Sequence, residues 1–157
     1  MFQKILVPLD GSKLAECVFG HLDALARGCQ VKTIIFAHVV EPYQNPSYVS
    51  ESTISATADE IQQINTANKG AAETYLKGLV PKFKYENVGV QSELLSGNPA
   101  EMLADYASKN SPDLILIATH GRTGPSRWVW GSVADRLLRA ACVPVLMVRA
   151  PGCFPGI

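Results

Sequence analysis

Short apolar runs alternate along the chain with longer segments in which hydrophobic positions recur at helical spacing. The apolar runs are rich in β-branched residues and have the length of strands. They read "KILVPLD", "KTIIFAHVV", "NVGVQSELL", "DLILIAT" and "VPVLMVR". The fourth run has no polar interruption, which is typical of a strand covered on both faces.

Four helical patterns fall between these runs. The first covers about residues 13–26, with Ser12 as its expected N-cap, and its apolar side chains share one face. The second runs through the apolar positions between Ile61 and Leu79 and ends at Pro81. The third is "GNPAEMLADYASK", where we expect Asn98 to cap the helix, Pro99 to take its first position and Glu101 to complete a capping box. The fourth is "SVADRLLRAA".

This strand–helix alternation predicts an α/β fold, a doubly wound parallel sheet with helices on both faces. With 157 residues, we expect a single domain over residues 1–157. Two segments do not fit a regular element. Residues 41–56 contain two prolines and several hydroxyl side chains, which predicts a mobile, exposed excursion. Residues 150–157, rich in proline and glycine, predict an irregular tail.

Composition narrows the classes of function. The chain has 14 basic and 14 acidic residues, a balance that argues against a general nucleic-acid binder. It has no signal-peptide pattern and no apolar run near the ~20 residues of a membrane helix, so we expect a cytoplasmic protein without a membrane partner. The four cysteines show no metal-ligand spacing, and we expect reduced, buried thiols and no protein metal site.

Candidate chemistry lies after the first and fourth strands, in "VPLDGS" and "ATHGRTG". Ligands of doubly wound sheets bind beyond the carboxyl ends of the strands. Neither a dinucleotide fingerprint nor a P-loop is present. Nevertheless, Gly121 and Gly124 allow close backbone approach, and Gly131 and Ser132 stand where a helix begins, so that free N–H groups can meet an anion. A phosphate site and an ordinary surface turn both fit this pattern.

Simpler interpretations exist for individual residues. Asp10 could serve only the turn before the first helix. Trp128 and Trp130 fit apolar cover of the domain or a partner better than base stacking. No Ser-His-Asp, Cys-His or paired-carboxylate arrangement can be argued, so the sequence does not predict an enzyme.

Over nearly its whole length the chain resembles the universal stress protein family. The resemblance is carried by "ILVPLDGS", "AHVVEP", "GNPAEML", "DLILIATHGRTG", "GSVADRLLR" and "VPVLMVR". The family's nucleotide motif, G-x2-G-x9-G-[ST], aligns here with Ala118, Gly121, Gly131 and Ser132, so alanine stands where the motif has its first glycine.

The resemblance implies a five-stranded sheet of order 3-2-1-4-5, with ATP, ADP or AMP bound at the switch point between strands 1 and 4, and Mg possible alongside ATP. Pro8 and the backbone of Val39 would flank adenine, and Asp10 would accept from ribose hydroxyls. Phosphates would meet N–H groups of the glycine-containing loop and the helix that follows, with added charge from Arg122. The full set of implied nucleotide-binding residues is Pro8, Leu9, Asp10, Val39, Ala118, Gly121, Arg122, Gly131, Ser132 and Val133.

The function implied is that of an adenine-nucleotide-binding regulatory protein of the stress response, acting with a protein partner not identified by the sequence. Two alternatives stay open. One is a dimeric interaction module that binds no nucleotide, which Ala118 makes plausible. The other is a slow ATPase, although no general base is evident in the sequence. The resemblance also implies a homodimer through the last strand, about Val143–Arg149, an apolar edge that invites pairing. Because Ala118 ends a regular strand, we expect its φ to be negative and alanine to be tolerated there.

Overall fold

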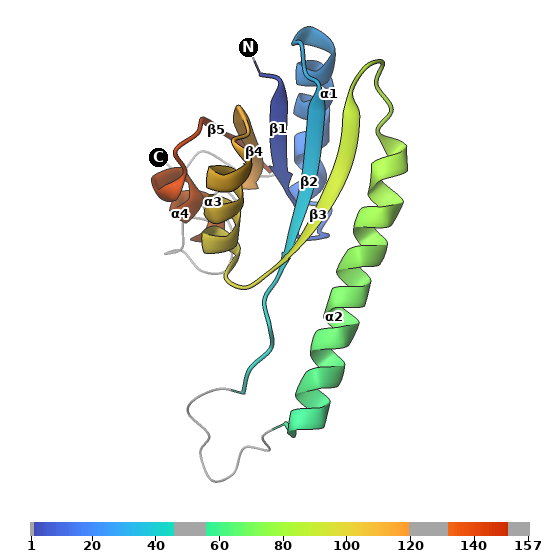
Figure 1. Cartoon of the computed structure of the whole chain (residues 1–157), viewed down its shortest axis with the longest axis vertical. Helices are drawn as coiled ribbons and strands as arrows, with labels where there is room; N and C mark the ends of the chain where they lie inside the picture. Colours follow the sequence, from blue (N-terminus) through green and yellow to red (C-terminus); the bar gives the residue numbers. More distant parts are fainter. Residues whose placement is uncertain (1, 46–55, 120–131, 151–157) are drawn as a thin grey trace.

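A computed structural model describes residues 2–45, 56–119 and 132–150. Its sheet has five parallel strands in the order β3-β2-β1-β4-β5, which confirms the predicted fold class and strand order (Figure 1). The strands are β1 (Lys4–Pro8), β2 (Thr33–Val40), β3 (Gly89–Ser96), β4 (Leu114–Thr119) and β5 (Val145–Arg149).

Helices cover both faces of this sheet. They are α1 (Phe19–Gly28), α2 (Ala58–Leu79), α3 (Pro99–Asn110) and α4 (Ser132–Ala140), with short 3-10 helices at Ala15–Val18 and Val80–Lys82. Buried side chains of α1 and α2 pack on one face of the central strands, around Phe36. Those of α3 and α4 pack on the other face, around Ile35 and Ile115. In β4, the first four residues are buried, as its apolar run predicts.

The starts of the helices differ in detail from the prediction. The Ser12 hydroxyl accepts a hydrogen bond from the Ala15 N–H (3.1 Å), as expected of a cap, but the first turn is 3-10 and α1 begins only at Phe19. In α2, a capping box of Thr57 and Glu60 starts the helix three residues before Ile61. Asn98 caps α3 through the Glu101 N–H (3.4 Å); among the described residues, the return bond from the Glu101 side chain is not formed.

The ends of the predicted excursion are held by side-chain amides. The Asn65 side chain exchanges two hydrogen bonds with the backbone of Tyr43, and the Asn45 side chain exchanges two with that of Ala56. Residues 41–44 are exposed, as predicted. Residues 46–55, where mobility is also predicted, and the tail 151–157 lie outside the described residues.

Three further features concern the exposed side chains of β5, the thiols and the length of the helices. Leu146 and Met147 of β5 are 41% and 38% exposed. The thiols of Cys29 and Cys142 are free. The expectation of burial is wrong for Cys142, which is exposed, while Cys17 and Cys29 are half-buried. None of the helices within the described ranges is long and apolar enough to cross a membrane.

Candidate functional site

The two neighbours of β1 pair with it to different extents. With β2, the parallel register runs from Lys4↔Thr33 to Pro8↔Ala37, the whole length of β1. With β4, the register covers only Ile5↔Leu114 and Leu6↔Ile115. The seam between β1 and β4 is therefore open at its carboxyl end.

Pro8 gives a physical reason for the early end of this register. In a parallel strand, alternate residues direct their backbone groups to opposite neighbours. The Leu9 N–H donates to the Ala37 carbonyl of β2 (2.8 Å), whereas the Lys4 carbonyl accepts from the Asp113 N–H (2.8 Å), just before β4. Residues 4 and 8 are an even number of positions apart, so the backbone groups of residue 8 also point toward β4. Proline has no N–H to donate there. The ladder toward β4 therefore lacks a donor at this position.

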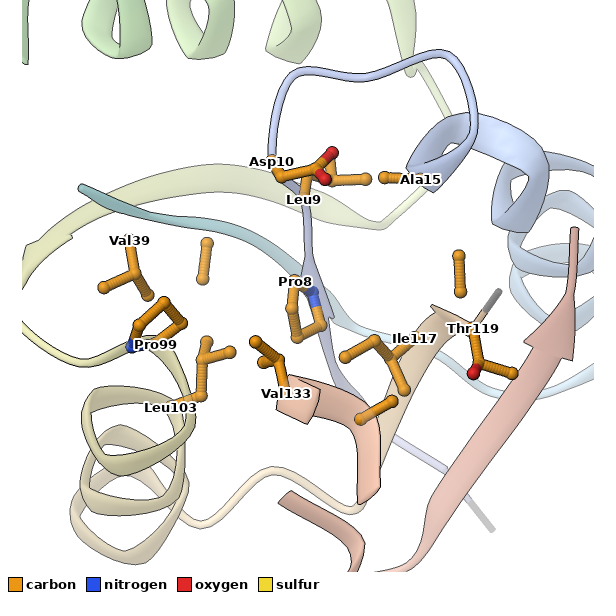
Figure 2. A pocket seen from close by; sticks show the side chains of 13 residues that line it. Pro8, Leu9, Asp10, Ala15, Val39, Pro99, Leu103, Ile117, Thr119 and Val133 are labelled. Atoms are coloured by element: carbon orange, nitrogen blue, oxygen red, sulfur yellow. The ribbon is translucent and has the colours of Figure 1, made fainter. Parts of the chain in front are cut away.

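A pocket of about 240 Å³ lies at this opening (Figure 2). Its walls come from the carboxyl ends of β1, β2 and β4 and from the first turns of α3 and α4. The described residues that line it are Pro8, Leu9, Asp10, Ala15, Ala37, Val39, Pro99, Leu103, Ile117, Ala118, Thr119, Val133 and Ala134.

Asp10 is the one charged side chain among these described lining residues. Its Oδ1 accepts a hydrogen bond from the Ser12 N–H (2.9 Å), and Gly11 between them has a φ of +80°. Asp10 therefore does stabilise the turn before the first helix, as its simpler interpretation predicts. This role does not occupy the side chain, because Asp10 is exposed and a carboxylate has several acceptor positions on its two oxygens. The turn holds this carboxylate at the mouth of the pocket.

Two helices begin at the pocket. The first turn of α3 contributes Pro99, and α4, which starts at Ser132, contributes Val133 and Ala134. The amino end of a helix carries unpaired N–H groups and a positive partial charge. The pocket thus joins apolar walls to a carboxylate on one side and to helix ends that favour an anion on the other.

The structure brings six predicted site residues into this one pocket: Pro8, Leu9, Asp10, Val39, Ala118 and Val133. Gly121, Arg122 and Gly131 lie outside the described residues, as do Trp128 and Trp130. Ser132 is the first residue of α4.

Sequence reasoning missed the small and apolar part of the lining. These residues are Ala15, Ala37, Pro99, Leu103, Ile117, Thr119 and Ala134. Most of them resemble ordinary core positions, so hydrophobicity alone does not distinguish pocket residues from residues of the hydrophobic core. One signal was available: α3 follows β3 closely, so its first turn must lie at the carboxyl edge of the sheet.

Ala118 lies in a regular part of β4, in register with Val148 of β5. Among the described residues, the only ones other than glycine with positive φ are Asn87 and Ser111. The expectation of a negative φ at Ala118 is therefore confirmed, and the backbone there does not require glycine.

Comparisons with known proteins agree with this architecture. The chain matches the universal stress protein family over residues 1–149. It is 30% identical over 154 residues to a universal stress protein of Methanocaldococcus jannaschii, covering 96% of this chain and 84% of that one.

Solved structures show the same fold. A universal stress protein of Lactobacillus plantarum superposes with a TM-score of 0.74 at 21% identity, covering 94% of this chain and 98% of the other. A family protein of Arabidopsis thaliana with AMP bound gives a TM-score of 0.61 at 16% identity, covering 96% and 93%. On the family match and the M. jannaschii relative, this chain belongs to the universal stress protein family.

Proposed function

We propose that this protein binds an adenine nucleotide in the pocket between β1 and β4 and acts as a regulatory protein in the stress response. The observation that carries the proposal is the opening of the β1–β4 seam at Pro8, which creates a pocket where six residues of the implied nucleotide site meet. The AMP complex of the Arabidopsis relative supports the class of ligand.

The chemistry of the pocket matches the parts of a nucleotide. Pro8, Val39 and Leu103 form apolar walls suited to adenine, and Asp10 offers acceptors to ribose hydroxyls. A volume of about 240 Å³ is below the roughly 300–1,000 Å³ of sites that enclose a whole drug-sized ligand, so base and ribose would be enclosed and the phosphates would extend beyond.

Phosphates would then meet the amino end of α4, at the N–H groups of Ser132 and Val133. We propose the same role for the N–H groups of Gly121 and Gly131, and added positive charge from Arg122. ATP, ADP and AMP all fit this assignment. Mg would accompany ATP through the phosphates, because among the described residues no group of histidine, cysteine or acidic side chains could hold a metal ion.

We propose binding and not catalysis, because we assign the one carboxylate of the described pocket lining, Asp10, to the ribose. A slow ATPase would need a general base near the terminal phosphate. The free thiols of Cys29 and Cys142 suit a reducing compartment, and we propose a cytoplasmic location on that ground.

Titration calorimetry with ATP, ADP and AMP tests the proposal. We expect one site per chain, and Asp10→Ala should weaken binding by about tenfold or more because the ribose loses its acceptor. The control is Asp59→Ala, an exposed carboxylate in the first turn of α2, which should leave the affinity unchanged. Absence of heat with all three nucleotides would favour the nucleotide-free interaction module.

We also propose a homodimer through β5, at about residues 143–149. Edge strands with exposed apolar side chains invite pairing, and Leu146 and Met147 are such side chains. Met147→Lys should shift the protein toward monomer in light scattering. Ile64→Lys removes an equally exposed apolar side chain from α2 and should leave the mass unchanged. A monomeric wild type at micromolar concentration would contradict this proposal.

A further inference from the structure

Asp10, the residue that we assign to the ribose, lies just beyond the sheet. The Leu9 N–H still donates to the Ala37 carbonyl of β2 (2.8 Å), but β1 itself ends at Pro8. After that bond the chain turns at Gly11, whose φ is +80°, and Asp10 is exposed. The strand therefore does not fix the direction of the carboxylate. That direction depends on the turn and on the contacts that hold the turn.

A series of hydrogen bonds joins this turn to α2. Asp10 Oδ1 accepts from the Ser12 N–H (2.9 Å), and the Ser12 carbonyl accepts from the Glu16 N–H (3.3 Å). The Glu16 carboxylate then accepts from the Tyr75 hydroxyl at Oε1 (3.0 Å). Glu16 belongs to the 3-10 helix that follows the turn, whereas Tyr75 belongs to α2, so the last bond is a tertiary contact.

The rings of His38 and Tyr75 pack beside the same turn. A Cβ placed at Gly11 would lie 3.7 Å from His38 Cε1, which is ordinary van der Waals contact, so the His38 ring lies next to the turn. The Tyr75 ring meets the His38 ring nearly edge-on, with 6.1 Å between the centroids. Both rings line a groove of about 560 Å³ between α2 and the carboxyl end of β2, together with Asp10 and Gly11. The turn is thus linked to α2 by packing as well as by hydrogen bonds.

The bond from Tyr75 to Glu16 is suited to a fixed position. Burial, followed by the Glu16 carboxylate, raises the pKa of the Tyr75 phenol, so the hydroxyl stays protonated and remains a donor at neutral pH. A hydrogen bond to a carboxylate is stronger than one between neutral groups. This bond is also partly buried, which limits competition from water. The Tyr75 hydroxyl can therefore hold Glu16, and with it the start of the 3-10 helix.

We propose that Tyr75 is a positioning residue of the nucleotide site, which acts through Glu16 and Ser12 to direct the Asp10 carboxylate toward the ribose hydroxyls. The proposal rests on nucleotide binding at the β1–β4 seam. A carboxylate that is already held in its binding geometry loses less conformational freedom when the ribose binds. No residue of α2 is among the described residues that line the nucleotide pocket, so this helix would act on the affinity only through the turn.

Titration calorimetry with ATP and 2′,3′-dideoxy-ATP tests this proposal, because only ATP has the ribose hydroxyls. Tyr75→Phe keeps the ring beside His38 and removes the hydroxyl. It should weaken ATP about fivefold and change dideoxy-ATP by less than about twofold. The matched control is Tyr85→Phe, which removes another half-buried phenol beside a carboxylate, that of Asp23 in α1. It should alter the affinity for neither nucleotide.

Two variants of Glu16 separate its hydrogen bond from its charge. Glu16→Gln and Glu16→Ala both remove the charge, but glutamine keeps an acceptor oxygen for the Tyr75 hydroxyl. Glu16→Gln should therefore bind ATP about fivefold more tightly than Glu16→Ala. In an Asp10→Ala background, Tyr75→Phe should have no further effect on ATP, because the carboxylate that it positions is gone.

The wild type should bind ATP about tenfold or more tightly than dideoxy-ATP. If Tyr75→Phe weakens both nucleotides equally or weakens neither, or if the two Glu16 variants bind ATP equally well, the positioning role is overturned and nucleotide binding stands. Equal affinity of the wild type for ATP and dideoxy-ATP would have the same consequence. If ATP itself does not bind to the wild type, both proposals fall.

Discussion

The two seams of β1 differ, and the difference decides where this fold can hold a ligand. Toward β2, five consecutive positions of β1 are in register, from Lys4↔Thr33 to Pro8↔Ala37. Toward β4, the register stops after Leu6↔Ile115. At the amino end, both seams are closed, and the β4 side is reinforced by the Asp113 carboxylate, which accepts from the Gln3 and Lys4 N–H groups (2.9 and 2.8 Å).

The comparison shows that a parallel sheet can be opened locally without a break in the strand. Pro8 stays in the β2 ladder, where its position needs no N–H, and leaves the β4 ladder, where it would. Leu6 and Ile115, the last pair in register between β1 and β4, are fully buried. The missing N–H at position 8 contributes to this opening, and the strand ends and helix starts around it form the pocket.

The largest expected effect comes from closing the open seam with Pro8→Val. An N–H at position 8 can donate toward β4, so the ladder can extend and narrow the pocket. We expect nucleotide affinity to fall about tenfold or more. Hydrogen exchange should show a protected amide at position 8.

Pro99→Ala is the matched control, because it replaces a pocket proline in the first turn of α3, outside any strand ladder. It should change the affinity far less. If the Pro8→Val amide is protected but the nucleotide affinity is unchanged, extension of the β1–β4 ladder does not affect binding. That result would contradict the proposal that the open seam is the binding site.

A smaller effect is expected from crowding the opening at Ala118. Ala118→Val adds two methyl groups beside the pocket and should weaken the nucleotide by about fivefold. Ala118→Gly should change the affinity by less than about threefold, because alanine is unstrained there. A gain of about tenfold or more in the glycine variant would mark this chain as a weakened binder and would favour the interaction module.

The smallest effect concerns the β1–β2 side of the sheet, where His38 of β2 is not among the residues that line the pocket of the β1–β4 seam. Burial lowers the pKa of His38 below its ordinary value, so the folded state favours the neutral ring. The stabilisation is complete above the unfolded pKa of roughly 6.5 and is lost as the pH falls through the lower folded pKa.

The free energy of unfolding should therefore decrease from about pH 7.5 to about pH 5.5 in denaturant titrations, and His38→Phe should reduce this decrease. His21→Gln, at an exposed position of α1, is the control. The same pH dependence in the wild type and in His38→Phe would show that His38 is not buried as described.

Much of the fold was predictable because periodicity reports burial directly. The alternation of apolar runs and helical patterns predicted the parallel sheet, and the resemblance supplied the strand order. The start of α2 was missed although Thr57 and Glu60 form a recognisable capping box, because attention to apolar spacing favoured Ile61. The 3-10 turn before α1 depends on local backbone geometry, which apolar spacing does not report.

The candidate site was predictable where its residues are chemically unusual. Pro8 and Asp10 interrupt an apolar strand and its turn, and each has a distinct physical role. Leu103 and Ala134 could not be told from core residues, because their position at the pocket depends on how two helices meet the sheet edge. His38 looked like an ordinary strand residue, and only the packing of α2 across β2 shows that its ring borders a groove.

Amide chemical-shift mapping with AMP tests whether the open end of the β1–β4 seam binds the nucleotide, since it locates the ligand as well as detecting it. We predict that titration shifts the amides around the open end of the β1–β4 seam, those of Leu9, Asp10, Val39, Ala118 and Val133. Those of Lys4 and Asp113, at the closed amino end, should not move. Shifts confined to the closed end or to β5, or no shifts at millimolar AMP, would contradict this prediction.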